Sequence, residues 1–424
     1  MFIYQILPLR LKRRLSLFFF ATAVITAIAV CISSSIMVLH GAQASFASSA
    51  AWTSCMSGGV CIPRGDGISA AALTGVSAKG AVLLEAETGT VIFGHQQNLR
   101  LPMASTTKIM TALVALEQLP SDTPVTITAD AVGIEGSSIY LTEGETLTME
   151  QLLYALLLES ANDAAVAIAI AVAGGVDEFA ELMNRRARDL DLTQTHFTNP
   201  HGLDNEEHYT TALELAKITQ AALANPTFRR ICSTRRHTIP LNGSEGTRVL
   251  VNHNKLLAAY PGCIGIKTGF TKKTGRCLVS AAERDGVTLI AVTLNAPDDW
   301  RDHAAMLDYG FGIYESVQLC KEGFFSAPLP IISGTREYVM VENFSDRSMT
   351  LRRDHGPIAC VAELPRFAFA PIAGKQAVGR LVFYEICPDG TRIRLCEVSL
   401  HATYSTDEIQ YKKGLMDWLL SLRK

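Results

Sequence analysis

Residues 101–120 read LPMASTTKIMTALVALEQLP. Apolar residues recur in this segment with the period of a helix, at Ile109, Ala112, Leu113 and Leu116. The spacing predicts a helix that buries one stripe and ends before Pro120. Ser105 and Lys108 lie three residues apart at its start, so they share a face and their hydroxyl and amine can come within hydrogen-bond distance.

A serine beside a buried lysine is a pairing used in nucleophilic catalysis. Burial lowers the proton affinity of an amine, so Lys108 can act as the base that activates Ser105. The same spacing also fits a serine N-cap followed by a solvated lysine, and a second S-x-x-K match runs from Ser421 to Lys424. One such motif is therefore weak evidence, and further motifs in the right order are needed.

The composition describes a folded, exported protein. The chain has 424 residues, of which 48% are hydrophobic, and a net charge of −3. This is enough for two or three domains with sizeable cores, and the near-neutral balance argues against nucleic acid as a partner. Basic residues between Arg10 and Arg14 precede an apolar run over 15–39, and Ala42-Gln43-Ala44 matches a cleavage site. Residues 1–44 are thus a removed signal peptide or an uncleaved anchor, and the cleavage motif favours removal after Ala44.

The cysteines and histidines predict no metal site and no cofactor. Loss of Cys31 with the N-terminal segment would leave nine of the ten cysteines, an odd number. Cys55 and Cys61 are close enough in sequence for a local disulfide, whereas Cys387 and Cys396 are placed asymmetrically about the Asp389-Gly390 turn. His201 and His208 lack the i, i+4 spacing of a helical metal pair, so polar loop histidines are the favoured interpretation.

The order of elements predicts an α+β domain after a linker over residues 45–79. Two strands at 81–84 and 90–93 form a hairpin, and a capping box of Thr148 and Gln151 opens a helix. Further segments are a buried apolar run at 164–173, a helix at 209–224 ended by Asn225-Pro226, a meander of strands at 263–268, 276–283 and 287–294, and a closing helix at 300–314. Strands at both ends imply one sheet that joins the hairpin to the meander.

Two more polar motifs interrupt apolar segments. Ser160 and Asn162 lie between two buried helices, where unpaired polar groups are costly; they are either functional residues or a C-cap and an N-cap. Lys267 and Thr268 project from an apolar strand and Gly269 follows, an arrangement suited to an anion that approaches the backbone. A second K-T-G at 273–275 lies in a turn and is interpreted as chance.

These motifs occur in the order S-x-x-K, S-x-N, K-T-G, as in penicillin-binding proteins and class A β-lactamases. The surrounding sequences at 104–112, 136–141, 199–203 and 265–279 resemble low-molecular-mass D-alanyl-D-alanine carboxypeptidases, which are serine peptidases of the S11 type. The resemblance implies a penicillin-binding-protein/β-lactamase-like transpeptidase fold, an antiparallel sheet with helices, over residues 80–317. A small β-rich domain at 318–404 would follow it.

The resemblance also implies roles for the site residues. Ser105 attacks the carbonyl between two D-alanines of the peptidoglycan stem peptide, and Lys108 takes its proton. Ser160 relays a proton to the leaving amine. Substrate binding falls to Asn162, Lys267, Thr268 and Gly269, and to Arg301, for which a solvated helix arginine is the alternative. The backbone N–H groups of Ser105 and Phe270 form the oxyanion hole, and β-lactam antibiotics are expected as covalent inhibitors.

Two other functions fit parts of the sequence. A class A β-lactamase needs S-D-N where this chain has Ser160-Ala161-Asn162, and a deacylating glutamate between the second and third motifs; Glu206 and Glu207 lie in that interval, in a stretch that matches the carboxypeptidases. A non-catalytic cell-wall-binding protein would not need intact motifs.

The C-terminal segment 405–424 has apolar residues at helical spacing between basic ones. It predicts an amphipathic helix that either lies on the membrane surface or packs on the second domain. We therefore expect an extracytoplasmic protein associated with the cytoplasmic membrane.

Overall fold

The computed structural model describes residues 53–55, 73, 75–241 and 246–409. The chain divides into two compact units. Of the described residues, the α+β unit comprises those from 73 to 320 and 347–357, and the β unit comprises 53–55, 321–346 and 358–409. Each unit is described by itself.

The α+β unit contains the main helices of the described chain. They are α2 (Lys108–Gln118), α3 (Met149–Leu158), α4 (Asn162–Ala173), α5 (Val176–Asp189), α6 (Ala212–Leu223), α7 (Pro226–Ser233), α8 (Leu256–Ala259) and α9 (Asp299–Ile313), with the 3-10 helices η2 (Ala104–Thr107) and η3 (Ala129–Ala131). Its sheet strands are β2 (Gly80–Glu85), β3 (Val91–His95), β8 (Cys263–Thr271), β9 (Gly275–Arg284) and β10 (Val287–Leu294). Three two-stranded ribbons complete it: β4 (Pro124–Thr126) with β5 (Thr146–Thr148), β6 (Arg236–Pro240) with β7 (Thr247–Val251), and β11 (Tyr314–Cys320) with β14 (Arg347–Arg352).

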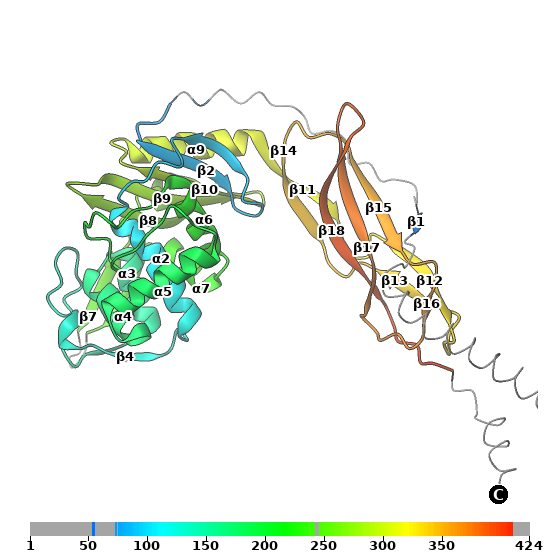
Figure 1. The fold of residues 1–424 in the computed structure, drawn as a ribbon, viewed down its shortest axis with the longest axis horizontal. Helices are drawn as coiled ribbons and strands as arrows, with labels where there is room; N and C mark the ends of the chain where they lie inside the picture. The colour runs from blue at the N-terminus through cyan, green and yellow to red at the C-terminus, as the bar shows by residue number, and fades with distance from the viewer. Residues whose placement is uncertain (1–52, 56–72, 74, 242–245, 410–424) are drawn as a thin grey trace, which may run out of the picture. The chain divides into compact units, whose positions relative to one another are not determined.

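The five-stranded sheet is antiparallel and has the order β3-β2-β10-β9-β8. The N-terminal hairpin therefore joins the later meander, as the sequence predicts. Alternate residues of the strands face two cores: Val82 and Val292 pack under helices α2 to α7, whereas Leu83 and Ala291 pack under α9. Figure 1 shows α9 on one side of this sheet and helices α2 to α7 on the opposite side. The strand that carries the K-T-G motif, β8, lies at the sheet edge.

Helix boundaries follow local chemistry. The predicted capping box forms at α3: Gln151 N donates to Thr148 Oγ1 at 3.3 Å, and Thr148 N donates to Gln151 Oε1 at 2.8 Å. Helix α6 ends at Leu223, just before Asn225-Pro226, as the sequence predicts. Asn225 caps α7 by accepting from Thr227 N, and Pro226 is the first residue of that helix, so the pair begins a helix as well as following one.

The β unit is a seven-stranded sheet in the order β1-β15-β17-β18-β13-β12-β16. Its strands are β1 (Thr53–Cys55), β12 (Ser326–Ile332), β13 (Tyr338–Glu342), β15 (Ile358–Leu364), β16 (Ala368–Phe369), β17 (Ala377–Ile386) and β18 (Arg392–Ala402). Leu381, Phe383 and Leu400 are among its buried residues.

Three predicted boundaries differ from the structure. Thr53–Cys55 within the expected linker 45–79 forms a strand that pairs with β15. The α+β unit extends past residue 317 to Cys320 and takes in 347–357, because β11 pairs with β14. The expected tail helix does not begin at residue 405, since Thr406 and Glu408 form bridges to Ile372 and Gly334. Residues 410–424, the rest of that helix, and the apolar run 15–39 lie outside the described residues.

No helix in the described part of the chain has the length and apolar character needed to cross a membrane.

Candidate active site

Ser105 lies on η2, directly before α2. Its neighbours from Met103 to Lys108 are buried, whereas Ser105 itself is partly exposed and accessible to a ligand. Ala104 has φ +46°, and a Cβ on Gly202 would lie 2.0 Å from the Ala104 carbonyl oxygen. Glycine is therefore required at residue 202 so that the 198–203 segment can pack against this turn.

Lys108 is fully buried and its amine is held at three points. Nζ donates to Ser105 Oγ at 3.1 Å, to Asn162 Oδ1 at 2.7 Å and to the His201 carbonyl oxygen at 2.6 Å. Burial lowers the pKa of Lys108 well below its ordinary range, and the nearby Lys267 lowers this pKa further while Asp163 opposes the shift. An amine with a depressed pKa and a hydrogen bond to a serine hydroxyl has the geometry of a nucleophile and its base.

The S-x-N motif lies at the junction of α3 and α4. Ser160 is 6% exposed and has φ +61°, an uncommon conformation for a residue with a side chain. Ala161 is the N-cap of α4, and the Asn162 side chain binds Lys108 Nζ and the Glu135 carbonyl oxygen instead of capping. The capping alternative for Asn162 is therefore wrong, and the structure brings Asn162 to Lys108, the residue that also contacts Ser105.

The third motif begins at a distorted point of β8. A β-bulge interrupts the register between Cys263 and Gly265, and Gly265 and Ile266 have φ of +99° and +104°. Such a φ at a β-branched residue is strained, at a cost of about 1–3 kcal/mol, and strain of this kind is found at functional sites. The bulge re-aims the strand just before Lys267.

Lys267 is buried, with 1% of its surface exposed, and its Nζ donates to the Thr268 carbonyl oxygen at 2.8 Å. Burial lowers the pKa of Lys267 to about 7, against the opposing effect of Glu159. Lys273 of the second K-T-G is exposed in the turn after β8. Only the first K-T-G therefore supplies a buried cation.

The K-T-G strand lies directly beside the nucleophile. A Cβ on Gly269 would lie 3.2 Å from each of three atoms, Met103 O, Ser105 N and Thr106 N. The missing side chain therefore lets the backbone of β8 approach η2, where the N–H groups of Ser105 and Phe270 are expected to form the oxyanion hole. The Phe270 side chain is 65% exposed, so its backbone, and not its ring, is the part suited to this role.

His208 stabilises the η2 turn that carries Ser105, through a contact with Thr107. Thr198 N donates to His208 Nδ1 at 3.1 Å, so the ring proton of His208 is on Nε2. Nε2 lies 2.7 Å from Thr107 Oγ1 and donates to it. The Thr107 hydroxyl in turn donates to the Ala104 carbonyl oxygen. Burial lowers the pKa of His208 to about 3, which matches this neutral ring. Sequence reasoning favoured a polar loop histidine; His208 does lie in a loop but is buried.

Arg301 lies away from these contacts. It is on α9, its side chain is 77% exposed, and its guanidinium pairs with Asp298 at 3.0 Å. Among the described residues it makes no hydrogen bond or ion pair with Ser105 or Lys267. Its part in carboxylate binding stays a prediction.

The described residues hold no group of three or more His, Cys, Asp or Glu side chains that could bind a metal ion. Cys387 has a free thiol, and Cys396 lies opposite Phe383 in the sheet, so the structure does not join the two cysteines. The side chains of Cys55 and Cys61 lie outside the described residues. The site contains protein groups sufficient for nucleophilic attack on a carbonyl and for binding an anion.

Comparisons with known proteins agree with this geometry. The S11 peptidase family model, described as D-alanyl-D-alanine carboxypeptidase, matches residues 68–298. The D-alanyl-D-alanine carboxypeptidase DacF of Bacillus subtilis is 32% identical over 352 residues, which cover 81% of this chain and 88% of that protein.

Solved structures show the same similarity. Penicillin binding protein 5 from Haemophilus influenzae is 26% identical, with a TM-score of 0.61 over 81% of this chain and 100% of that one. The Streptomyces K15 DD-transpeptidase is 36% identical, with a TM-score of 0.54 over 57% of this chain and 99% of that one.

Proposed function

The chain belongs to the D-alanyl-D-alanine carboxypeptidase family of S11 serine peptidases, and we propose that it acts through an acyl-enzyme on Ser105. It is a serine-type hydrolase that removes the terminal D-alanine from peptidoglycan stem peptides and binds β-lactams. The observation that carries the assignment of the nucleophile is the buried Lys108 amine, 3.1 Å from Ser105 Oγ and held also by Asn162 and His201.

Acylation begins with proton transfer from Ser105 Oγ to Lys108 Nζ as the oxygen attacks the carbonyl of the penultimate D-alanine. The C–N bond then breaks, and the leaving amine takes a proton delivered from Lys108 through Ser160. Terminal D-alanine departs, and water later hydrolyses the ester on Ser105. A base in this position contributes about 10²- to 10⁴-fold in rate.

Two further groups support the transition state and the bound substrate. The N–H groups of Ser105 and Phe270 stabilise the negative oxygen, and one such donor contributes about 3 kcal/mol. Lys267 and Thr268, on the edge strand, bind the terminal carboxylate, with help from Arg301. A buried ammonium is suited to this because it attracts a carboxylate more strongly than an ammonium in water does.

Release of D-alanine tests this function. We expect the chain from residue 45 onward to release D-alanine from a diacyl-lysyl-D-alanyl-D-alanine peptide over many turnovers. The same peptide with an amidated C-terminus should show kcat/KM reduced at least about tenfold, because it lacks the charge that Lys267 binds. Equal rates for the two peptides would contradict the role of Lys267 in binding the terminal carboxylate.

Incubation with the same peptide and with a fluorescent penicillin separates the other functions. A β-lactamase would hydrolyse penicillin rapidly without releasing D-alanine; Glu206 and Glu207, its candidate deacylating groups, are both exposed. A binding protein would show neither labelling nor release. Release that requires an added amine acceptor would indicate a transpeptidase. For the carboxypeptidase we expect a penicilloyl adduct that outlives the peptidyl one.

We also propose that the protein is exported and that its C-terminal segment binds the membrane surface. Residues 405–424 carry apolar and basic side chains at helical spacing, with Trp418 among them. The truncation that tests this ends at Ile409, because Thr406 and Glu408 bridge within the β unit and should be kept.

Flotation with vesicles that contain phosphatidylglycerol measures this binding. We expect residues 45–424 to float with the vesicles and residues 45–409 to stay in the load fraction, because the apolar stripe and its basic flanks are lost. Equal recovery of both proteins would contradict the anchor.

A further inference from the structure

The loop of residues 135–145 holds Asn162 from outside the three motifs. Asn162 N donates to the Ser137 carbonyl oxygen at 2.7 Å, and Asn162 Nδ2 donates to the Glu135 carbonyl oxygen at 2.6 Å. A Cβ on Gly136 would lie 2.7 Å from Asn162 Nδ2. The loop therefore fixes the amide whose oxygen accepts from Lys108 Nζ.

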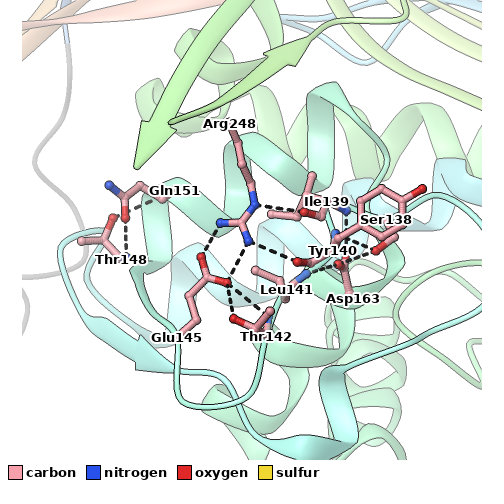
Figure 2. Close-up of polar contacts among 10 residues, drawn as sticks. All are labelled: Ser138, Ile139, Tyr140, Leu141, Thr142, Glu145, Thr148, Gln151, Asp163 and Arg248. Atoms are coloured by element: carbon pink, nitrogen blue, oxygen red, sulfur yellow. Dashed lines mark hydrogen bonds and ion pairs between the residues drawn. The ribbon is translucent and has the colours of Figure 1, made fainter. Parts of the chain in front are cut away.

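One part of the loop is anchored to α4 by Asp163. This buried carboxylate accepts from Ser138 Oγ at 2.6 Å, Leu141 N at 3.0 Å and Ile139 N at 3.3 Å. Figure 2 shows these contacts converging on Asp163. Asp163 is adjacent to Asn162 in sequence, so the anchor and the active-site amide share one helix start.

The other part of the loop is held by Arg248, which comes from the separate hairpin β6–β7. Arg248 Nε donates to the Ile139 carbonyl oxygen at 3.0 Å, and Nη2 donates to that of Tyr140 at 3.2 Å. The guanidinium also pairs with both carboxylate oxygens of Glu145. Figure 2 shows Arg248 lying between Glu145 and the backbone at residues 139–140. The Glu145 side chain is fully buried and that of Arg248 is 11% exposed, so water competes little for these contacts.

The opposite end of β7 contacts Glu159, the residue directly before Ser160. Val251 N donates to Glu159 Oε1 at 2.5 Å, and His253 Nε2 lies 3.2 Å from Glu159 Oε2. One strand thus contacts both the 135–145 loop, through Arg248, and Glu159 directly before the S-x-N motif, through Val251.

We propose that Arg248 is a positioning residue for acylation: with Glu145 it locks the 135–145 loop, which keeps Asn162 and hence the Lys108 amine in place against Ser105. This inference rests on the proposed function, since it concerns the same acylation. The alternative is that the ion pair only stabilises the fold. The planar fork of arginine matters to the proposal because it serves two carbonyls and a carboxylate together.

The test measures acylation of the full mature chain by a fluorescent penicillin, with the rate constant k2 separated from the dissociation constant K. We expect Arg248→Gln to lower k2 about ten- to a hundredfold, the range for a small misplacement caused from a distance. K should change little, because the penicillin carboxylate binds on β8. Thermal unfolding of each protein shows how much stability is lost.

Two variants serve as controls. Arg236→Gln changes an exposed arginine on the partner strand β6 and should leave k2 within about twofold of the parent, as expected for a surface substitution. Met306→Ala opens a cavity in the core beneath α9, on the other face of the sheet, and should lower the melting temperature without slowing k2.

The outcomes are distinct. An unlabelled parent protein would contradict the proposed function itself. A labelled parent together with a k2 for Arg248→Gln equal to that of Arg236→Gln would overturn only the positioning role. If Arg248→Gln yields no folded protein, Arg248→Lys tests the positioning role instead. This variant keeps a positive charge beside Glu145 but lacks the planar guanidinium that serves two carbonyls and a carboxylate together. A slow k2 supports the proposal, and a parental k2 overturns it.

Discussion

Ser105→Ala is expected to abolish covalent labelling by a fluorescent penicillin and to reduce D-alanine release by roughly a million-fold, as loss of the nucleophile does in a serine peptidase. The lactam carbonyl and the D-alanyl-D-alanine carbonyl meet the same oxygen, so both activities should disappear together. Lys108 remains in the variant but has no hydroxyl to deprotonate. Gel fluorescence and a D-alanine assay measure the two losses.

The chain contains a matched control for this substitution. Ser421 also precedes a lysine by three residues, in the C-terminal segment. Ser421→Ala should label and turn over as the parent does. Thermal unfolding of Ser105→Ala should stay close to that of the parent, since Ser105 is partly exposed. Labelling that survives in Ser105→Ala would place the nucleophile at another residue.

Local features of this site could be predicted from the sequence because they depend on the spacing of a few consecutive residues. The three-residue interval between Ser105 and Lys108 gives a 3.1 Å contact, and the interval between Thr148 and Gln151 gives a reciprocal cap. Apolar runs bounded by turns likewise placed the central strands of the sheet, since β2 and β10 are buried along nearly their whole length.

Contacts between distant segments could not be predicted in this way. The His201 carbonyl that accepts from Lys108 is a backbone group 93 residues along the chain, and no residue type marks it. The contacts of Arg248 with the 139–140 backbone are of the same kind. The strained φ of Ile266 was also missed, because the sequence suggests an ordinary strand there and only tertiary packing imposes the bulge.

Helix α5 has a buried face whose spacing can be recognised in the sequence. Its buried residues are Phe179, Ala180, Met183 and Ala187, which follow the i, i+1, i+4, i+8 spacing of one helix face. The helical spacing of this buried face is therefore visible in the sequence itself. By contrast, β11 pairs with β14 across an intervening part of the β unit, and strand spacing alone does not reveal that crossing.

Lys267→Ala is expected to reduce kcat/KM for a peptide with a free terminal carboxylate by roughly a hundredfold, equivalent to about 3 kcal/mol for loss of one partner of a buried charge pair. Lys273→Ala is the matched control, since Lys273 begins the second K-T-G but is exposed. It should remain within about twofold of the parent, as a surface substitution does. Exchanged phenotypes for the two lysines would assign carboxylate binding to the other motif.

The pH dependence of kcat/KM gives a second measurement of the same role. Burial lowers the pKa of Lys267 to about 7, so its positive charge is present below that pH and is lost as the pH rises through it. Lys108 has the opposite requirement, because it must be neutral to accept the proton of Ser105, and its pKa is held well below its ordinary range. The parent should therefore lose kcat/KM above about pH 7, a profile that reports the free enzyme. Lys267→Ala and the amidated peptide should both lack this alkaline decrease, because neither retains the charge pair. An unchanged decrease in Lys267→Ala would assign it to another group.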